Sequence, residues 1–111
     1  MKIFVDIDET ICITDGPKNL ARDYSKANPI LENIKAVNKL YEQGHHITYW
    51  TARGTESGID WTDVTKKQLL EWGAKHNHLI LGKPSYDLYI DDKSINTRNW
   101  EKLGRCIPEL L

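Results

Sequence analysis

Four short apolar runs, separated by segments of helical periodicity, constrain the fold of this chain more than any other feature. The runs cover residues 2–6, 46–50, 78–81 and 88–90. Apolar stretches of this length, rich in β-branched and aromatic residues, are typical of buried strands. Strands that alternate with helices favour a parallel sheet, because parallel neighbours need a long crossover connection. The pattern therefore predicts an α/β fold in which a parallel sheet lies between helices on both of its faces.

Two of the connecting segments have the periodicity of helices that pack on such a sheet. A helix over residues 28–44 can begin at Asn28, a favourable N-cap, and end at Gly44. Its apolar residues recur at helical spacing and are Ile30, Ile34, Val37 and Tyr41. Residues 60–73 carry a weaker apolar stripe, and a last helix is expected to begin near Ser94.

The composition is that of one soluble domain over residues 1–111, with 40% hydrophobic and 28% charged residues. A net charge of −1 lacks the basic excess of proteins that bind nucleic acids or anionic membranes. No stretch has the pattern of a targeting signal or a membrane span. Cys12 and Cys106 are far apart, which favours two buried thiols in a reducing cytosol over a disulfide. We therefore expect a cytoplasmic protein that binds neither nucleic acid nor membrane.

Polar side chains follow each of the four expected strands. The groups are Asp6-Ile7-Asp8, Thr51-Ala52-Arg53, Gly82-Lys83 and Asp91-Asp92. Any one of them is ordinary turn chemistry, but the whole set is not expected from turns alone. The carboxyl ends of parallel strands meet at one edge of the sheet, where open α/β folds bind their ligands. We therefore expect these groups to lie close together.

Such a cluster of carboxylates requires a cation. Two unit charges about 4 Å apart repel by roughly 4 kcal/mol at an effective dielectric constant near 20. Ligands that are all oxygen favour Mg²⁺ over zinc. A phosphate would complete the arrangement, with Lys83 and the Thr51 hydroxyl as its partners. One carboxylate could then attack phosphorus, and the carboxylate two residues on could carry the proton.

In this order the four groups resemble the motifs of the haloacid dehalogenase superfamily of aspartate-nucleophile phosphotransferases, over nearly the whole chain. The matches are DIDET at residues 6–10, Thr51 in YWTARG, Lys83 as the basic residue, and Asp91-Asp92 in LYIDD. The strings YWTARG and GKPSYDLYIDDKS look like a small group of that superfamily associated with capsular polysaccharide or lipopolysaccharide biosynthesis. The resemblance implies a Rossmann-like sheet and a minimal core without a cap domain.

The resemblance also implies a function, namely Mg²⁺-dependent hydrolysis of a small phosphomonoester such as a sugar phosphate or glycan precursor. Asp6 would be the nucleophile that forms an aspartyl-phosphate, and Asp8 the general acid and base. Thr51, the Ala52 amide and Lys83 would bind the transferring phosphoryl group. The implied metal ligands are the Asp6 carboxylate, the Asp8 carbonyl, Asp91 and Asp92, with the split of roles between the last two left open.

Many relatives carry a cap domain that selects the substrate, and this chain has room only for a flap over residues 12–28. Substrate selection would then fall to the flap, to the residues after the second strand, or to a neighbouring subunit. The candidate substrate contacts are Arg22, Tyr24, Arg53 and Trp61. Because a site without a cap is open to water, association of subunits into a homo-oligomer is expected.

Two other functions use parts of the same chemistry. A phospho-receiver also carries Asp, Thr and Lys on a parallel sheet, although its phosphorylated Asp lies on a middle strand rather than the first. A nucleic-acid 3′-end phosphatase belongs to the same superfamily, but the near-neutral charge disfavours it. Lys66 or Lys67 could replace Lys83 as the basic residue. The four histidines are expected in turns or on the surface rather than in a metal site.

Overall fold

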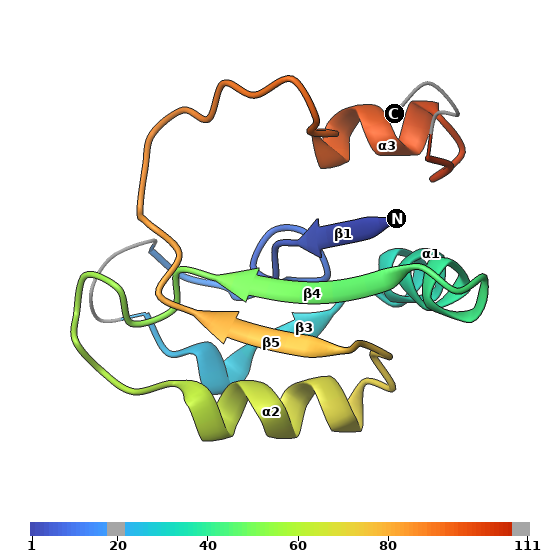
Figure 1. Cartoon of the computed structure of the whole chain (residues 1–111). Coiled ribbons are helices and arrows are strands. Elements are labelled where there is room, and N and C mark those ends of the chain that lie inside the picture. Colours follow the sequence, from blue (N-terminus) through green and yellow to red (C-terminus); the bar gives the residue numbers. More distant parts are fainter. Residues whose placement is uncertain (18–21, 108–111) are drawn as a thin grey trace.

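A computed structural model describes residues 1–17 and 22–107 as an α/β fold (Figure 1). In chain order its elements are β1 (Lys2–Val5), β2 (Cys12–Ile13), the 3₁₀ helix η1 (Tyr24–Lys26), β3 (Asn28–Pro29), α1 (Leu31–Glu42), β4 (His46–Thr51), α2 (Thr62–Glu71), β5 (His78–Leu81) and α3 (Thr97–Lys102). Residues 18–21 of the expected flap and residues 108–111 of the expected domain lie outside the described part. None of the described helices combines the length and apolar character that crossing a membrane requires.

The main sheet has three parallel strands in the order β1-β4-β5, which confirms the parallel α/β arrangement. Val5 pairs with Tyr49, and Thr51 pairs with Leu81. The carboxyl ends of the three strands therefore lie next to one another at one edge of the sheet. A separate antiparallel pair joins β2 to β3 and forms a described part of the flap.

The three helices expected from the sequence are present with shorter bounds. α1 begins three residues later than predicted, because Asn28 and Pro29 form β3 and pair with β2. α2 is two residues shorter at each end than the predicted segment. α3 begins at Thr97, where the Asn96 side chain accepts the N–H of Arg98 as a helix cap.

The sheet buries one face against α1 and α2. Ile47 and Tyr49 of β4 are fully buried there. Ile34 and Val37 of α1 and Leu69 of α2 belong to the same core. This core fixes the three strands and so fixes the positions of the residues that follow them.

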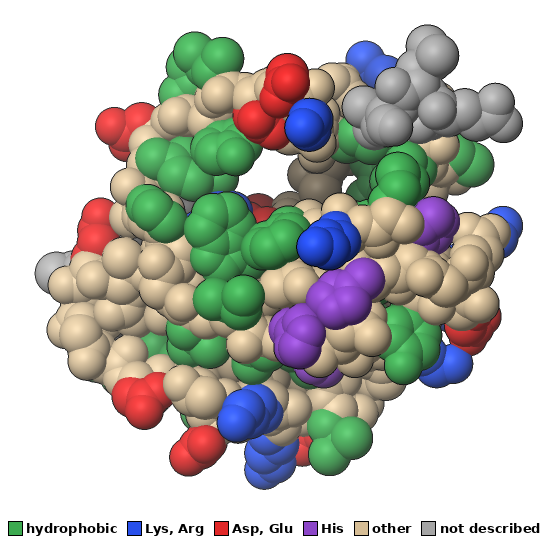
Figure 2. Space-filling model, viewed as in Figure 1, with side chains coloured by type: hydrophobic (Ala, Val, Ile, Leu, Met, Phe, Trp, Pro, Cys, Tyr) green, Lys and Arg blue, Asp and Glu red, His purple; other side chains and the backbone are tan. Residues whose placement is uncertain are grey.

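The opposite face of the sheet is largely open within the described residues, which corrects the prediction of helices on both faces. Phe4 is 57% exposed, and its ring lies edge-on to Trp50 with 5.8 Å between centroids. Figure 2 shows hydrophobic side chains gathered on this side of the molecule. The reason is topological: the steps from β1 to β4 and from β4 to β5 run in one direction. Right-handed crossovers then place both connecting helices on the same face.

The prediction of a fourth strand over residues 88–90 is wrong for this structure. After β5 the chain swings away from the sheet and returns at α3 (Figure 1). Ile90 is 89% exposed, and within the described residues β1 pairs only with β4. A run of three residues forms few ladder hydrogen bonds, which offset little of the entropy lost on ordering a long loop. One edge of β1 therefore stays open.

The two cysteines are both free thiols, but only one of them is buried as expected. Cys12 is buried and Cys106 is exposed. Burial raises the pKa of Cys12 to about 12, and the nearby charge of Asp8 acts in the same direction. Cys12 is therefore a protonated core thiol rather than a nucleophile.

Candidate active site

Three adjacent parallel strands deliver a carboxylate, a hydroxyl and a lysine to one edge of the sheet. Asp6 directly follows β1, Thr51 is the last residue of β4, and Lys83 follows β5 after one glycine. The backbone N–H of Lys83 donates to the carbonyl of Thr51 at 3.1 Å and continues the β4–β5 pairing. The Lys83 Nζ atom lies 3.7 Å from Oδ1 of Asp6. The structure therefore brings together the three groups that the strand ends predict.

Asp6 combines partial burial with few compensating partners. Its Oδ1 atom accepts the N–H of Ile7 at 2.8 Å, and 40% of its side chain is exposed. Loss of hydration is the main cause that raises the pKa of Asp6, and the neighbouring charge of Asp8 adds to it. The Lys83 ammonium and the Ile7 N–H act against this rise. The carboxylate is therefore partly desolvated and faces a cation.

Lys83 is held in place by aromatic rings on two sides. Its Nζ atom lies 5.3 Å from the centroid of the Trp50 ring and 5.4 Å from that of Tyr86. Contacts of this kind stabilise an ammonium by roughly 0.5–2 kcal/mol. Lys66 and Lys67 are instead exposed on α2. Of these three lysines, Lys83 is the one that the structure places beside Asp6.

Thr51 and Ala52 form the turn that leaves β4. Thr51 is fully buried, and its hydroxyl oxygen accepts the N–H of Arg53 at 3.1 Å. Ala52 is half-buried between them. In this conformation the Thr51 hydroxyl fixes the turn, and the Ala52 amide lies at the same sheet edge as Asp6.

Asp8 forms a two-pronged ion pair with Arg53. Nε of Arg53 lies 3.0 Å from Oδ2 of Asp8, and Nη2 lies 3.0 Å from Oδ1. The Asp8 side chain is 16% exposed, whereas that of Arg53 is fully buried. Arg53, one of the candidate substrate contacts, thus lies inside the protein in this structure.

The other candidate substrate contacts separate into two places. The rings of Tyr24 and Trp61 meet edge to face with 5.2 Å between centroids, beside the Arg53 guanidinium. Arg22, which is part of the flap, instead pairs with Glu9 at 2.9 Å and donates to the carbonyl of Thr14. The rings of Tyr24 and Trp61 therefore pack together beside the Asp8–Arg53 pair, while Arg22 links two parts of the flap.

Sequence reasoning missed two polar residues of α2 that hold Arg53. Nη1 of Arg53 donates to the hydroxyl of Thr65 at 3.1 Å and to Oε1 of Gln68 at 2.6 Å. Both residues are buried on the core side of α2. They lie one turn apart, and Gln68 directly precedes the apolar Leu69. Polar residues at core positions of a helix are a signal for a buried partner, because buried polar groups are almost always hydrogen-bonded.

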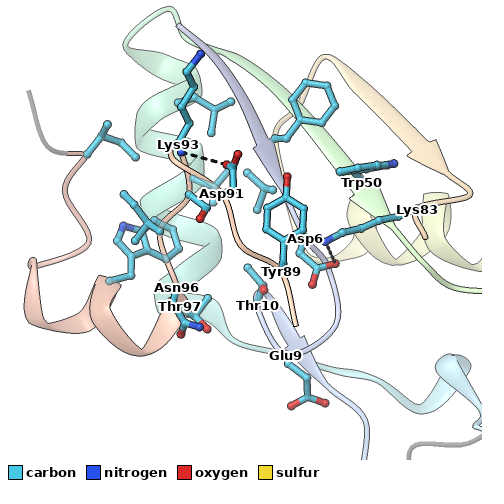
Figure 3. A pocket seen from close by; sticks show the side chains of 18 of the residues that line it. Asp6, Glu9, Thr10, Trp50, Lys83, Tyr89, Asp91, Lys93, Asn96 and Thr97 are labelled. Atoms are coloured by element: carbon cyan, nitrogen blue, oxygen red, sulfur yellow. Dashed lines mark hydrogen bonds and ion pairs between the residues drawn. The ribbon is translucent and has the colours of Figure 1, made fainter. Parts of the chain in front are cut away.

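A cleft of about 990 Å³ separates the open edge of β1 from the chain that leads to α3 (Figure 3). Asp6, Lys83 and the apolar residues of β1 line one side of it. The segment from Tyr86 to Thr97, apart from Ile90, lines the other side together with Trp100. Figure 2 shows the opening of this cleft between the sheet and the C-terminal part of the chain.

Asp91 and Asp92 line this cleft but are not gathered with Asp6. Both are exposed, and Oδ2 of Asp91 accepts the N–H of Lys93 at 3.1 Å (Figure 3). In residues 1–17 and 22–107, no three Asp, Glu, His or Cys side chains form a group that could hold a metal ion. The oxygen donors suit Mg²⁺ chemically, but this conformation does not assemble them.

Comparison with known proteins gives a likeness in fold. No protein-family model matches the chain, and a search of curated proteins returns no match. Among solved structures, the crystal structure of a target protein from Vibrio cholerae is similar, with a TM-score of 0.76 and 22% sequence identity. The similarity covers 95% of this chain and 95% of that one. The two proteins therefore share one α/β fold over nearly their whole lengths.

Proposed function

We propose that this chain is a Mg²⁺-dependent phosphomonoester hydrolase that forms an aspartyl-phosphate on Asp6. The observation that carries the proposal is the meeting of Asp6, Thr51 and Lys83 at the ends of adjacent parallel strands, with Lys83 Nζ 3.7 Å from Asp6 Oδ1. The resemblance of the four sequence motifs to those of haloacid dehalogenase phosphatases supports the same reaction. A small phosphorylated metabolite, such as a sugar phosphate or glycan precursor, is the proposed substrate.

The residues divide the reaction into two steps. In the first, a carboxylate oxygen of Asp6 attacks phosphorus, the bond to the leaving oxygen breaks, and Asp8 gives that oxygen a proton. In the second, water attacks phosphorus and Asp8 takes a proton from it, while the bond between phosphorus and the Asp6 oxygen breaks and releases the Asp6 carboxylate and inorganic phosphate. Lys83 offsets negative charge on the phosphoryl oxygens in both steps. Bound Mg²⁺ would supply further charge compensation between the phosphate and the carboxylates.

The proposal requires Asp91 or Asp92 to approach Asp6, and the open edge of β1 offers a route. We propose that residues 88–90 add to this edge as a fourth parallel strand. Leu88, Tyr89 and Ile90 are exposed apolar residues, and Leu88 and Tyr89 line the cleft together with β1. Burial of such side chains contributes about 1.5–3 kcal/mol each. Asp91 would then follow a strand beside β1, as Asp6 does, and the result would be the minimal core of the haloacid dehalogenase superfamily.

Hydrogen exchange tests this strand addition. With Mg²⁺ and beryllium fluoride, a phosphate analogue, we expect the amides of residues 88–90 to exchange at least about tenfold more slowly, because they become paired in a ladder. The variant Ile90→Pro should lose this protection, because proline lacks the N–H that the ladder needs. Ile90→Val is the matched control. Exchange at 88–90 that stays fast in the presence of both ligands would contradict the fourth strand.

Phosphate release from a panel of esters tests the function itself. We expect hydrolysis of an aryl phosphate and of at least one sugar or alkyl phosphate with Mg²⁺, and a fall of at least about 100-fold with a chelator. Restoring Mg²⁺ should restore the rate. Activity that a chelator leaves unchanged would overturn the metal requirement, and absence of release from every ester would overturn the proposal. An aspartyl-phosphate that persists for minutes to hours would indicate a phospho-receiver instead.

A further inference from the structure

Every N–H group of the Arg53 side chain has a protein partner. A guanidinium has five N–H donors and no acceptor. Nε and one N–H of Nη2 bind the two oxygens of Asp8. The two N–H groups of Nη1 bind Thr65 and Gln68, and Nη2 also reaches Sγ of Cys12 at 3.6 Å. No donor is left over for a phosphate, so this buried arginine is not built to bind substrate directly.

The position of Arg53 is fixed from two sides, by α2 and by the Tyr24 ring. Thr65 and Gln68 hold it from α2, and Gln68 in turn donates to the carbonyl of Tyr24 at 2.7 Å. The Tyr24 ring lies over the guanidinium, 4.9 Å from Cζ of Arg53 to the ring centroid. The guanidinium is thus held in one orientation, in which Nε and Nη2 donate to the Asp8 carboxylate.

Asp8 contacts the buried Arg53 guanidinium and also reaches the surface. Its side chain retains 16% exposure at the same sheet edge as Asp6, while Arg53 has none. A carboxylate has about four lone-pair sites, and Arg53 uses those on one side. The remaining sites can still accept or release a proton toward the cleft. Paired, two-pronged contacts of this kind fix the plane of a carboxylate as well as its distance.

We propose that Arg53 is a positioning residue that orients Asp8 for proton transfer to the leaving group, with α2 as its support. This inference rests on the proposed function. The proton that Asp8 gives to the leaving oxygen returns from the attacking water, and Arg53 keeps all of its protons throughout. Through Asp8, Arg53 therefore acts on the two proton transfers, the first of which accompanies cleavage of the bond between phosphorus and the leaving oxygen, and not on phosphate binding.

The dependence of the rate on the leaving group distinguishes a positioning role for Arg53 from a structural role and from phosphate binding. An alkyl leaving group needs a proton as it departs, whereas p-nitrophenolate departs without one. For Arg53→Met we expect the single-turnover rate of glycerol release from glycerol 1-phosphate to fall about 10–100-fold, within the range of general acid catalysis, with KM nearly unchanged. We expect the single-turnover rate of p-nitrophenolate release from p-nitrophenyl phosphate to fall no more than about threefold, because that release precedes the step in which Asp8 acts as a base. Arg53→Lys should restore part of the loss, because an ammonium still donates to Asp8.

A second variant guards against misfolding at this buried site. Thr65→Val keeps the shape of the side chain but removes an acceptor from Arg53, and Thr65→Ser is its matched control. We expect Thr65→Val to show the same selective loss on the alkyl ester, about three- to tenfold, and Thr65→Ser to behave as the parent protein. Lys75→Met, at an exposed ion pair with Glu42, should change neither ester.

The outcomes separate this inference from the function on which it rests. Equal losses on both esters would indicate a structural role, and a rise in KM on both would indicate phosphate binding; either overturns the inference but leaves the hydrolase intact. Unchanged kinetics for Arg53→Met would overturn it as well. If the parent protein hydrolyses no ester of the panel, the proposed function fails and the inference fails with it.

Discussion

Replacement of Asp6 with asparagine is expected to lower phosphate release by about 10⁴-fold or more while the protein stays folded. Removal of a catalytic nucleophile has effects of this size or larger. Asparagine keeps the shape of the side chain and an oxygen that can accept the N–H of Ile7. It removes the second carboxylate oxygen and the charge, and with them the attack on phosphorus. Phosphate release under single-turnover and steady-state conditions measures the loss.

The folded state of this variant should be at least as stable as that of the parent protein. Burial raises the pKa of Asp6, which means that folding disfavours its charged form. A group with a raised pKa stabilises the fold below its unfolded pKa and loses that contribution as pH rises through its folded value. At neutral pH a neutral side chain therefore avoids this penalty, although the contact with Lys83 weakens. The midpoint of thermal unfolding should be unchanged or slightly higher.

Asp63 provides a matched control, because it is an exposed carboxylate on α2. Asp63→Asn should keep full turnover. If Asp6→Asn also kept full turnover, another residue would have to be the nucleophile and the proposed reaction would be wrong. A loss of turnover in Asp6→Asn together with a lower unfolding midpoint would point to misfolding. Labelling of the protein with the phosphoryl group of the substrate would then decide, because only the parent protein should become labelled.

The parts of the site that are local in sequence were predictable. Asp6, Thr51 and Lys83 each follow a strand whose apolar pattern is clear, and the parallel order of the strands places them together. Periodicity and chain order are sufficient for such residues. Lys66 and Lys67 remained alternatives to Lys83 at that stage, and the structure decides for Lys83, whose Nζ atom lies 3.7 Å from Asp6 while the other two lysines are exposed on α2.

The parts that depend on distant partners were not predictable. Pro29 suits the first turn of a helix as well as an edge strand, and its pairing with Cys12 decides for the strand. A run of three residues at 88–90 becomes a strand only if the edge of β1 accepts it, which no local pattern records. Arg53 was a candidate substrate contact because it follows the second strand, and the pairing of its side chain with Thr65 and Gln68 of α2 was not foreseen. The place of the Arg53 side chain depends on which face of α2 packs against the sheet.

The second large effect is expected at Lys83, where replacement by methionine should lower turnover by about 10²–10³-fold. This is the loss observed when one preorganised charge or donor is removed from a transition state. Methionine retains the apolar stem that packs between Trp50 and Tyr86, so the loop keeps its shape. The Asp6 carboxylate would lose its nearby cation, and the attack of one anion on another would become less favourable. Initial rates over a range of ester concentrations check this result.

Two further variants show whether the loss belongs to the position of Lys83 rather than to charge in general. Lys66→Met and Lys67→Met each remove one positive charge from α2, and we expect turnover within about twofold of the parent protein, because solvent screens charges on an exposed helix face. Lys83→Arg keeps the charge but places a larger fork between the two rings, and it should recover only part of the rate. A larger loss at Lys66 or Lys67 than at Lys83 would move the phosphate partner from the sheet edge to α2. Such a result would mean that the ends of β1, β4 and β5 do not form one phosphate site.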